Sequence, residues 1–261
     1  MNKFIISLIA AVSATTASAQ VSASPERFSP LAAGYLERAR TMLSSGNYPG
    51  VIDQLNELNT KGIILNQTEK EEYVFMLARA YYERGDAECV TLLRNFIRDY
   101  PASTHALEAR LSVGDYFFFH HLWPDALTEY DGIDFDRLNR EDFALYTYRH
   151  ALTQIKTGHY AEARQSLKAL KENRLYREAY TFYSAYLDYI DGDYDKAYTG
   201  FSKVRSGEKG LEAAYYMTQI DYNRGEYDRV AAKGQELLRS LSDPEPVSYT
   251  HLRAHETVLD L

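Results

Sequence analysis

The sequence predicts an all-α, right-handed solenoid of about six helical hairpins. Two observations lead to this fold class. A short pattern, Gly-x-Tyr-x-x-small, recurs along most of the 261 residues, and its copies are spaced as the repeats of a two-helix array are. The apolar content of 45% and the charged content of 25% are ordinary for a folded chain, so wholesale disorder is not expected.

The clearest copy of the pattern runs from Gly192 to Ala197. A glycine can end a helix because it adopts the left-handed conformation without a Cβ clash. Asp193 can then cap the next helix. Tyr194 can fill the corner between the two helices, and Ala197 lets their backbones approach closely. The hexapeptide therefore predicts the turn of a helical hairpin.

Six such turns follow one another along the chain. Four have the full pattern, whereas Gly85-Asp86-Ala87 and His121-Leu122-Trp123 are weaker copies. The turns are spaced 39, 36, 37, 34 and 33 residues apart, and their first residues are Gly46, Gly85, His121, Gly158, Gly192 and Gly225. We expect the array to span residues 31–241 as one elongated domain.

We number each repeat so that the first residue of its turn is position 15. In this numbering the repeats resemble the tetratricopeptide family, which has small residues at positions 8 and 20 and a large apolar residue at position 24. Position 8 is small in all six repeats: Ala39, Ala78, Gly114, Ala151, Ala185 and Thr218. Position 20 holds Val51, Val90, Ala126, Ala163, Ala197 and Val230. The resemblance implies that the two helices of each hairpin cross at these positions. Position 24 departs from the pattern at Arg94 and Gly234, so we expect the second and sixth repeats to pack less well.

The two ends of the chain do not belong to the repeat array. Residues 1–19 combine a lysine, a short apolar core and an Ala17-Ser18-Ala19 ending, which predicts a bacterial secretory signal peptide cleaved near Ala19. Residues 20–30 are expected to be a flexible lead-in, and no stretch predicts a membrane span in the mature chain. We therefore expect a periplasmic or otherwise exported protein.

The C-terminal residues 242–261 form an irregular tail in this interpretation. Residues 247–261 resemble a translated sequencing adapter, so we expect them to be non-native and the natural reading frame to continue past Pro246. A native but irregular tail is the alternative.

The Tyr100-Pro101-Ala102-Ser103 segment resembles a subgroup of these repeats found in bacterial envelope proteins. That subgroup includes proteins of the outer-membrane β-barrel assembly machine and a partner of the Tol-Pal system. The resemblance implies an envelope compartment and participation in an envelope complex.

No constellation in the sequence predicts catalysis, a metal site or a cofactor. Asp191, Asp193 and Asp195 have the spacing of a calcium loop, but Lys196 stands where that loop needs glycine. The adjacent His120 and His121 would point about 100° apart on a helix and could not share a metal. The single cysteine, Cys89, is expected to be a half-buried small residue. A net charge of −8 without a basic run argues against nucleic acid as a partner.

The tetratricopeptide resemblance implies a concave groove lined by positions 5, 9 and 12 of the first helix of each repeat. These positions are rich in aromatic residues, which suit an extended peptide or a partner helix. The predicted groove consists of Arg40, Phe75, Arg79, Tyr82, Phe118, Tyr148, Phe182, Tyr186, Tyr189, Tyr215 and Tyr222. Ordinary packing between repeats is the alternative explanation of this aromatic stripe.

The sequence therefore favours a non-catalytic envelope scaffold that binds a protein or peptide. One alternative is a spacer module of a longer envelope protein. Another is a helical-repeat enzyme or carbohydrate-binding protein, in which Trp123, Tyr186 and Tyr189 would stack on sugar rings.

Overall fold

The computed structural model describes residues 30–204 and 207–242, and every regular element in these two ranges is a helix. The predicted signal peptide and most of the lead-in and tail lie outside the described residues. Pro30 and Ser242, assigned above to the lead-in and the tail, are the first residue of α2 and the last residue of α13. The chain divides after Ile133 into two compact units.

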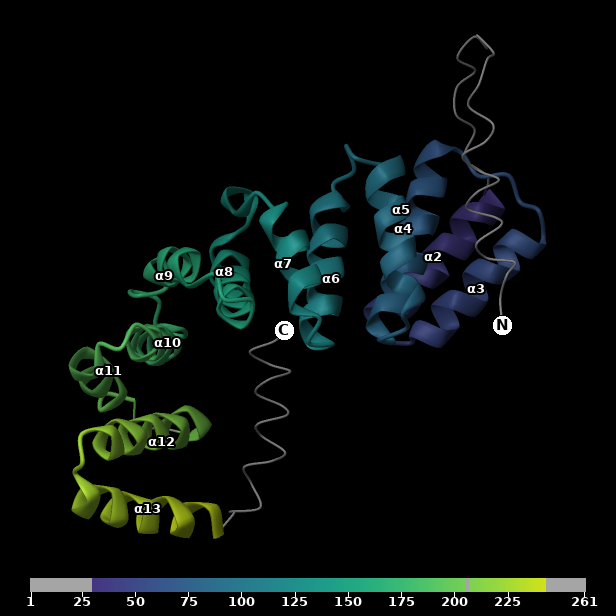
Figure 1. The fold of residues 1–261 in the computed structure, drawn as a ribbon. Helices are drawn as coiled ribbons and strands as arrows, with labels where there is room; N and C mark the ends of the chain where they lie inside the picture. The colour runs from purple at the N-terminus through teal and green to yellow at the C-terminus, as the bar shows by residue number, and fades with distance from the viewer. Residues whose placement is uncertain (1–29, 205–206, 243–261) are drawn as a thin grey trace. The chain divides into compact units, whose positions relative to one another are not determined.

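The first unit contains three helical hairpins. They are formed by α2 (Pro30–Ser44) with α3 (Tyr48–Thr60), α4 (Gln67–Glu83) with α5 (Glu88–Asp99), and α6 (Ala106–Phe119) with α7 (Trp123–Asp131) (Figure 1). Each helix contacts the next along the chain, and the first helices of consecutive hairpins also contact each other.

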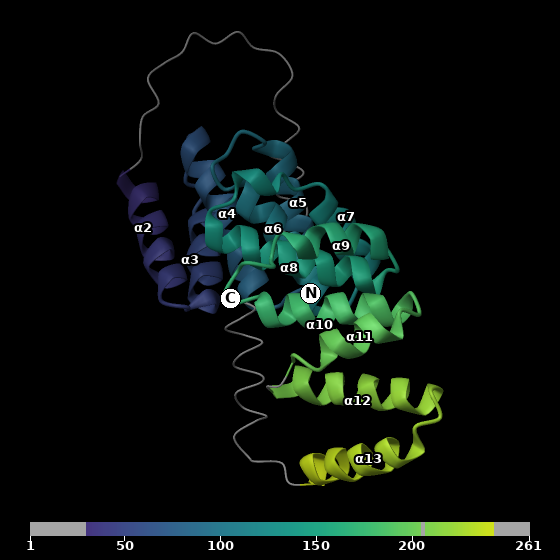
Figure 2. The same ribbon diagram turned by 90° about the vertical axis from the view of Figure 1, so that its left-hand side faces the viewer.

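The second unit repeats this arrangement after a short 3₁₀ helix, η1 (Phe135–Arg137). Its hairpins are α8 (Arg140–Lys156) with α9 (Tyr160–Lys168), α10 (Arg177–Ile190) with α11 (Tyr194–Phe201), and α12 (Gly207–Asn223) with α13 (Tyr227–Ser242). Figure 2 shows the last two pairs stacked, so that α11 lies between α10 and α12.

The first residue of every turn has the left-handed backbone conformation. Its φ lies between 57° and 82° in Gly46, Gly85, His121, Gly158, Gly192 and Gly225. Within the described residues, His121 is the single non-glycine with a positive φ. This conformation costs about 1–2 kcal/mol for a residue with a Cβ. The third hairpin therefore needs the same turn geometry as the others even where the sequence lacks glycine.

The helices of each hairpin touch at small residues. Ala126, Ala163 and Ala197 are completely buried, as is the valine at the same position of the first repeat. Gly114 lies against the Tyr130 ring so closely that an added Cβ would be 2.6 Å from it. The Tyr130 hydroxyl donates a 2.7 Å hydrogen bond to the buried Asp115 carboxylate. These contacts set the spacing between the two helices of a hairpin.

The second repeat packs well, contrary to the expectation from Arg94. Its buried residues are Cys89, Leu93 and Phe96, one position earlier than the sequence numbering places them, and Arg94 faces solvent. The Cys89 amide donates to the carbonyl three residues before it, whereas Val51, Ala126, Ala163 and Ala197 donate to the carbonyl four residues before them. Because a tighter turn rotates the helix further per residue, the same face is reached one residue sooner. The small residue of this repeat is thus Cys89 and not Val90.

An ion pair joins the two helices of the sixth repeat, and its lysine also hydrogen-bonds to the fifth repeat. Lys233 of α13 donates 2.6 Å hydrogen bonds to Asp221 of α12 and to the Tyr198 hydroxyl of α11. Asp221 is completely buried. Gly234 has open space where a side chain would begin. Through Lys233, α13 is thus connected to both α12 and α11.

Replacing Gly114 with alanine should destabilise the third hairpin. The new Cβ would collide with the Tyr130 ring, which its bond to Asp115 holds in place, so we expect a loss of about 1–3 kcal/mol in the free energy of unfolding. Gly34→Ala is the matched control, because the nearest heavy atom to an added Cβ there is 3.7 Å away. The control should gain about 0.4–1 kcal/mol. Urea denaturation of both variants measures the difference, and equal stabilities would contradict the proposed contact.

Replacing Ala197 with leucine should destabilise the fifth hairpin by about 1–3 kcal/mol, because the extra atoms have no room between α10 and α11. Ala33→Leu adds the same atoms on an exposed part of α2 and should change the stability little. Thermal unfolding followed by circular dichroism measures both. An unchanged melting curve for Ala197→Leu would mean that α10 and α11 do not meet at this residue.

Cys89 should be unreactive until the protein unfolds. Burial, aided by the nearby Asp86 carboxylate, raises the pKa of its thiol to about 12. At pH 8 roughly one thiol in ten thousand would then be ionised, and the side chain is also shielded from reagents. Labelling with an aromatic disulfide reagent should be fast in denaturant and slower by a factor of at least about 100 in its absence. Rapid labelling of the folded protein would contradict the burial of Cys89.

Candidate functional site

Three of the predicted groove residues belong to the core. Phe75, Phe118 and Phe182 are 6%, 7% and 2% exposed. Phe75 stacks on His105, which precedes α6, while Phe182 lies against Phe201 of its own hairpin. The groove prediction is wrong for these three side chains, because packing within and between hairpins uses them.

The two arginines of the predicted groove are already paired. Arg40 of α2 binds Glu72 of α4, and Arg79 of α4 binds Glu108 of α6 at 2.9 Å. Glu72 raises the pKa of Arg40 through a hydrogen bond. For Arg79, burial lowers the pKa but the neighbouring carboxylates outweigh it. Each pair links the first helices of consecutive hairpins, so neither guanidinium is a vacant carboxylate receptor.

Tyr82 and Tyr148 are half-buried and contact neighbouring side chains. The Arg79 guanidinium lies 5.3 Å from the centre of the Tyr82 ring. The Tyr148 ring centre is 5.2 Å from that of Tyr176 and 6.2 Å from that of Tyr183. Both tyrosines therefore contribute to packing and present only part of a ring to solvent.

The remaining four predicted residues form one surface on the second unit, which we call the tyrosine face: Tyr186 and Tyr189 of α10, with Tyr215 and Tyr222 of α12. Tyr186 and Tyr189 are half-buried. Tyr215 and Tyr222 are 52% and 57% exposed. The two helices contact each other, so these rings lie on adjoining helices of one compact unit.

Tyr216, which the sequence analysis missed, anchors the tyrosine face. Its ring centre lies 5.5 Å from Tyr186, 5.2 Å from Tyr189 and 5.5 Å from Tyr215, and it stacks on Phe201. Nothing in the tetratricopeptide pattern marks this position. The one available signal was that Tyr216 directly follows Tyr215. Consecutive residues of a helix point in different directions, so one ring of such a pair can face the surface while the other faces the core.

Two turn tyrosines extend the same surface. Tyr194 contacts Tyr189, and Tyr227 contacts Tyr222, with ring centres 5.6 and 5.8 Å apart. Tyr227 is 63% exposed. The turn pattern predicted that such tyrosines fill a corner between helices, which is wrong for Tyr227 because its ring remains largely in solvent.

Three half-buried phenols in and beneath the tyrosine face resist ionisation. Burial raises the pKa of the Tyr186, Tyr189 and Tyr216 phenols, with the neighbouring phenols adding to the shift. Neutral rings with hydroxyl tips can offer large contact areas and hydrogen bonds together. This chemistry suits a partner that brings apolar side chains and backbone polar groups.

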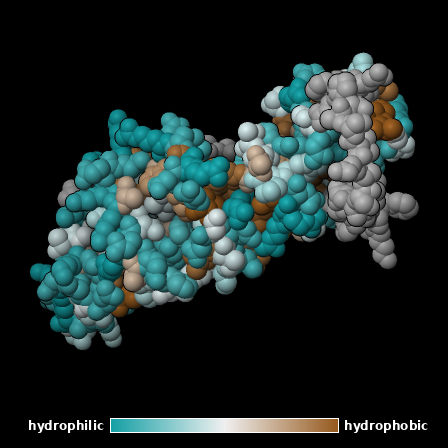
Figure 3. Space-filling model, turned by 90° about the horizontal axis from the view of Figure 1, so that it is seen from above, coloured by the Kyte–Doolittle hydropathy of each residue, from teal (hydrophilic) through white to brown (hydrophobic). Residues whose placement is uncertain are grey.

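The described residues offer no alternative site of metal-dependent chemistry. Among them, no group of three or more His, Cys, Asp or Glu side chains could hold a metal ion. None of the described helices combines the length and apolar character needed to cross a bilayer. Figure 3 shows one face of the molecule as mostly hydrophilic, with apolar residues in small separate patches.

Comparison with known proteins finds a family match for one of the repeats. Residues 72–103, which include α5 and its shifted register, match the family described as tetratricopeptide repeat. A search of the curated proteins found no match.

Two solved structures share the fold at low sequence identity. MamA of AMB-1 has a TM-score of 0.52 and 15% identity, and the match covers 67% of this chain and 90% of MamA. PilF of Pseudomonas aeruginosa has a TM-score of 0.52 and 12% identity, over 86% of this chain and 97% of PilF. Together with the hairpins and left-handed turns, these matches show that the described residues have the fold of a tetratricopeptide repeat array.

Proposed function

We propose that this chain is an exported, envelope-associated scaffold that binds an extended protein or peptide segment on the tyrosine face. The tetratricopeptide fold supports protein interaction in general. The observation that carries the site is the exposure of Tyr215 and Tyr222 beside rings that Tyr216 holds in place. Rings fixed before binding lose little rotamer entropy when a partner binds.

The two rival functions lack comparable support. Asp115, the acidic residue at position 9 of the third repeat, is buried and accepts a hydrogen bond from Tyr130, so it is not placed as an exposed carboxylate for glycoside cleavage. Trp123 begins α7 in the first unit, whereas Tyr186 and Tyr189 belong to the second. The spacer function requires no exposed aromatic cluster.

Peptide selection from a random phage-displayed library, followed by affinity measurement on the soluble chain, tests the tyrosine face. The double variant Tyr215→Ser, Tyr222→Ser should bind the selected peptides with an affinity at least about 10-fold lower, because it removes two contact rings without opening the core. Ile64→Ser, Leu175→Ser is the matched control, since those side chains are 88% and 72% exposed on loops elsewhere. An equal loss of peptide affinity in both double variants would contradict the assignment of binding to the tyrosine face.

Export is tested separately. Expression of the full chain in a Gram-negative host, followed by fractionation and mass spectrometry, should give a periplasmic product that begins at Gln20. A full-length cytoplasmic product would overturn the export proposal and leave the binding proposal unaffected.

A further inference from the structure

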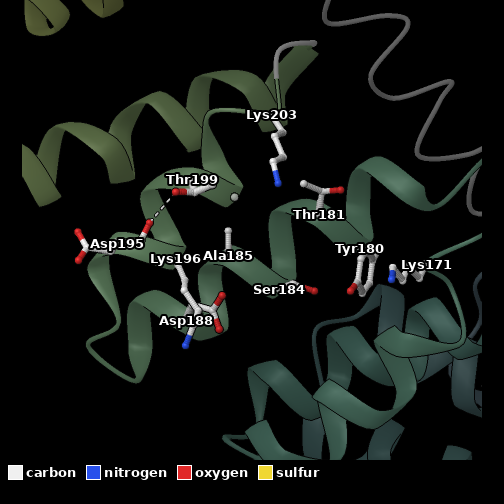
Figure 4. A pocket seen from close by; sticks show the side chains of 11 residues that line it. Lys171, Tyr180, Thr181, Ser184, Ala185, Asp188, Asp195, Lys196, Thr199 and Lys203 are labelled. Atoms are coloured by element: carbon white, nitrogen blue, oxygen red, sulfur yellow. Dashed lines mark hydrogen bonds between the residues drawn. The ribbon is translucent and has the colours of Figure 1, made fainter.

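A second surface feature lies between α10 and α11, within the second unit. It is an open pocket of about 540 Å³. Tyr180, Thr181 and Ser184 of α10 line it, together with Lys171 from the connection before α10 and Lys203 from the connection after α11. Figure 4 shows Lys203 beside Thr181, with Lys171 and Tyr180 on one side of the pocket and Asp188, Asp195 and Lys196 on the other.

The close approach of the two helices forms one wall of this pocket. Ala185 of α10 and Gly200 of α11 both line it, and a Cβ on Gly200 would lie 2.6 Å from the Ala185 Cβ. No longer side chain fits between them, so the wall there consists of backbone and a methyl group. Such a wall offers apolar contact to the carbon atoms of a ligand.

The charges of the pocket do not cancel. Its two acidic side chains are already engaged, Asp188 by Arg164 at 2.9 Å and Asp195 by Arg224. Lys196, the third lysine of the pocket, is paired with Asp193.

By contrast, the ammonium groups of Lys171 and Lys203 have no ion pair within the part of the chain that the structure describes. Two unpaired lysines in the lining of one pocket create a local positive field on a protein whose net charge is −8.

This pocket is separate from the tyrosine face. Ser184 and Tyr186 are two residues apart on α10, so their side chains point about 200° apart around the helix. A ligand in the pocket would thus approach α10 from the side opposite to Tyr186.

We propose that the pocket binds an acidic peptide segment, with one carboxylate on Lys171 and another on Lys203. The Ser184 and Thr181 hydroxyls add polar contacts, and the Tyr180 ring and Ala185 contact the carbon atoms between the carboxylates. A single phosphate ion would occupy only a small part of the volume. A chain that carries several carboxylates fills more of it and matches the charge of the two lysines.

Fluorescence anisotropy with a dye-labelled hexaglutamate peptide tests this site on the soluble chain. We expect saturable binding that weakens as sodium chloride rises from about 50 to about 300 mM. Lys171→Gln, Lys203→Gln should lower the affinity at least about 10-fold, because two charge-assisted contacts are lost. The matched control is Lys156→Gln, Lys168→Gln, which makes the same charge change on exposed lysines of α8 and α9. This control should lower the affinity for hexaglutamate less than about twofold. The single variant Lys203→Glu should also abolish binding while circular dichroism shows an unchanged helix content.

Three results would overturn the proposal. One is the absence of saturable binding by the unmodified chain, and another is an equal loss of affinity in the two double variants. The third is displacement of the peptide by inorganic phosphate at a concentration too low for ionic strength to explain, which would make the pocket a phosphate site. The Tyr215→Ser, Tyr222→Ser variant should retain hexaglutamate binding, so failure of this site and failure of the tyrosine face are distinguishable.

Discussion

The close approach of the two helices in each hairpin is the constraint on which this structure depends. It requires a small residue at the crossing and a turn that reverses the chain within a few residues. The left-handed turn residue supplies the reversal, and even His121 adopts it at an energetic cost. Gly114 and Gly200 show how little space remains, because one added methyl group would meet the Tyr130 ring or the Ala185 side chain. The position of each large side chain follows from this spacing.

The same spacing decides which aromatic residues of the first helices are buried and which remain partly exposed. Rings directed at the partner helix or the next hairpin, such as Phe75 and Phe182, complete the core. Rings on the remaining sector stay partly in water, and in the second unit they gather around Tyr216. The candidate binding face is therefore an extension of the core, which explains why its rings are held in defined positions.

Ion pairs join consecutive hairpins in both units, but the second unit also has lysines left over. In the first, Arg40 and Arg79 join the first helices of consecutive hairpins, and their pairing removes them from recognition. In the second, acidic side chains around α10 are paired while Lys171 and Lys203 are left without a counterion among the described residues. A single helix, α10, thus contributes neutral aromatic rings to one surface and a wall of a basic pocket to another.

The sequence by itself determined the helical hairpins, the turn positions and most of the small buried residues, because these depend on local backbone conformation and on a fixed repeat spacing. It misplaced the second repeat by one residue, since a tighter first turn of α5 changes the helical phase without changing the composition. It could not separate core rings from surface rings, because both recur at the same helical spacing. Only the tertiary structure decided that Phe182 is buried and Tyr215 exposed, and only it brought Lys171 and Lys203 to one pocket, since both depend on which neighbouring helix covers each side chain.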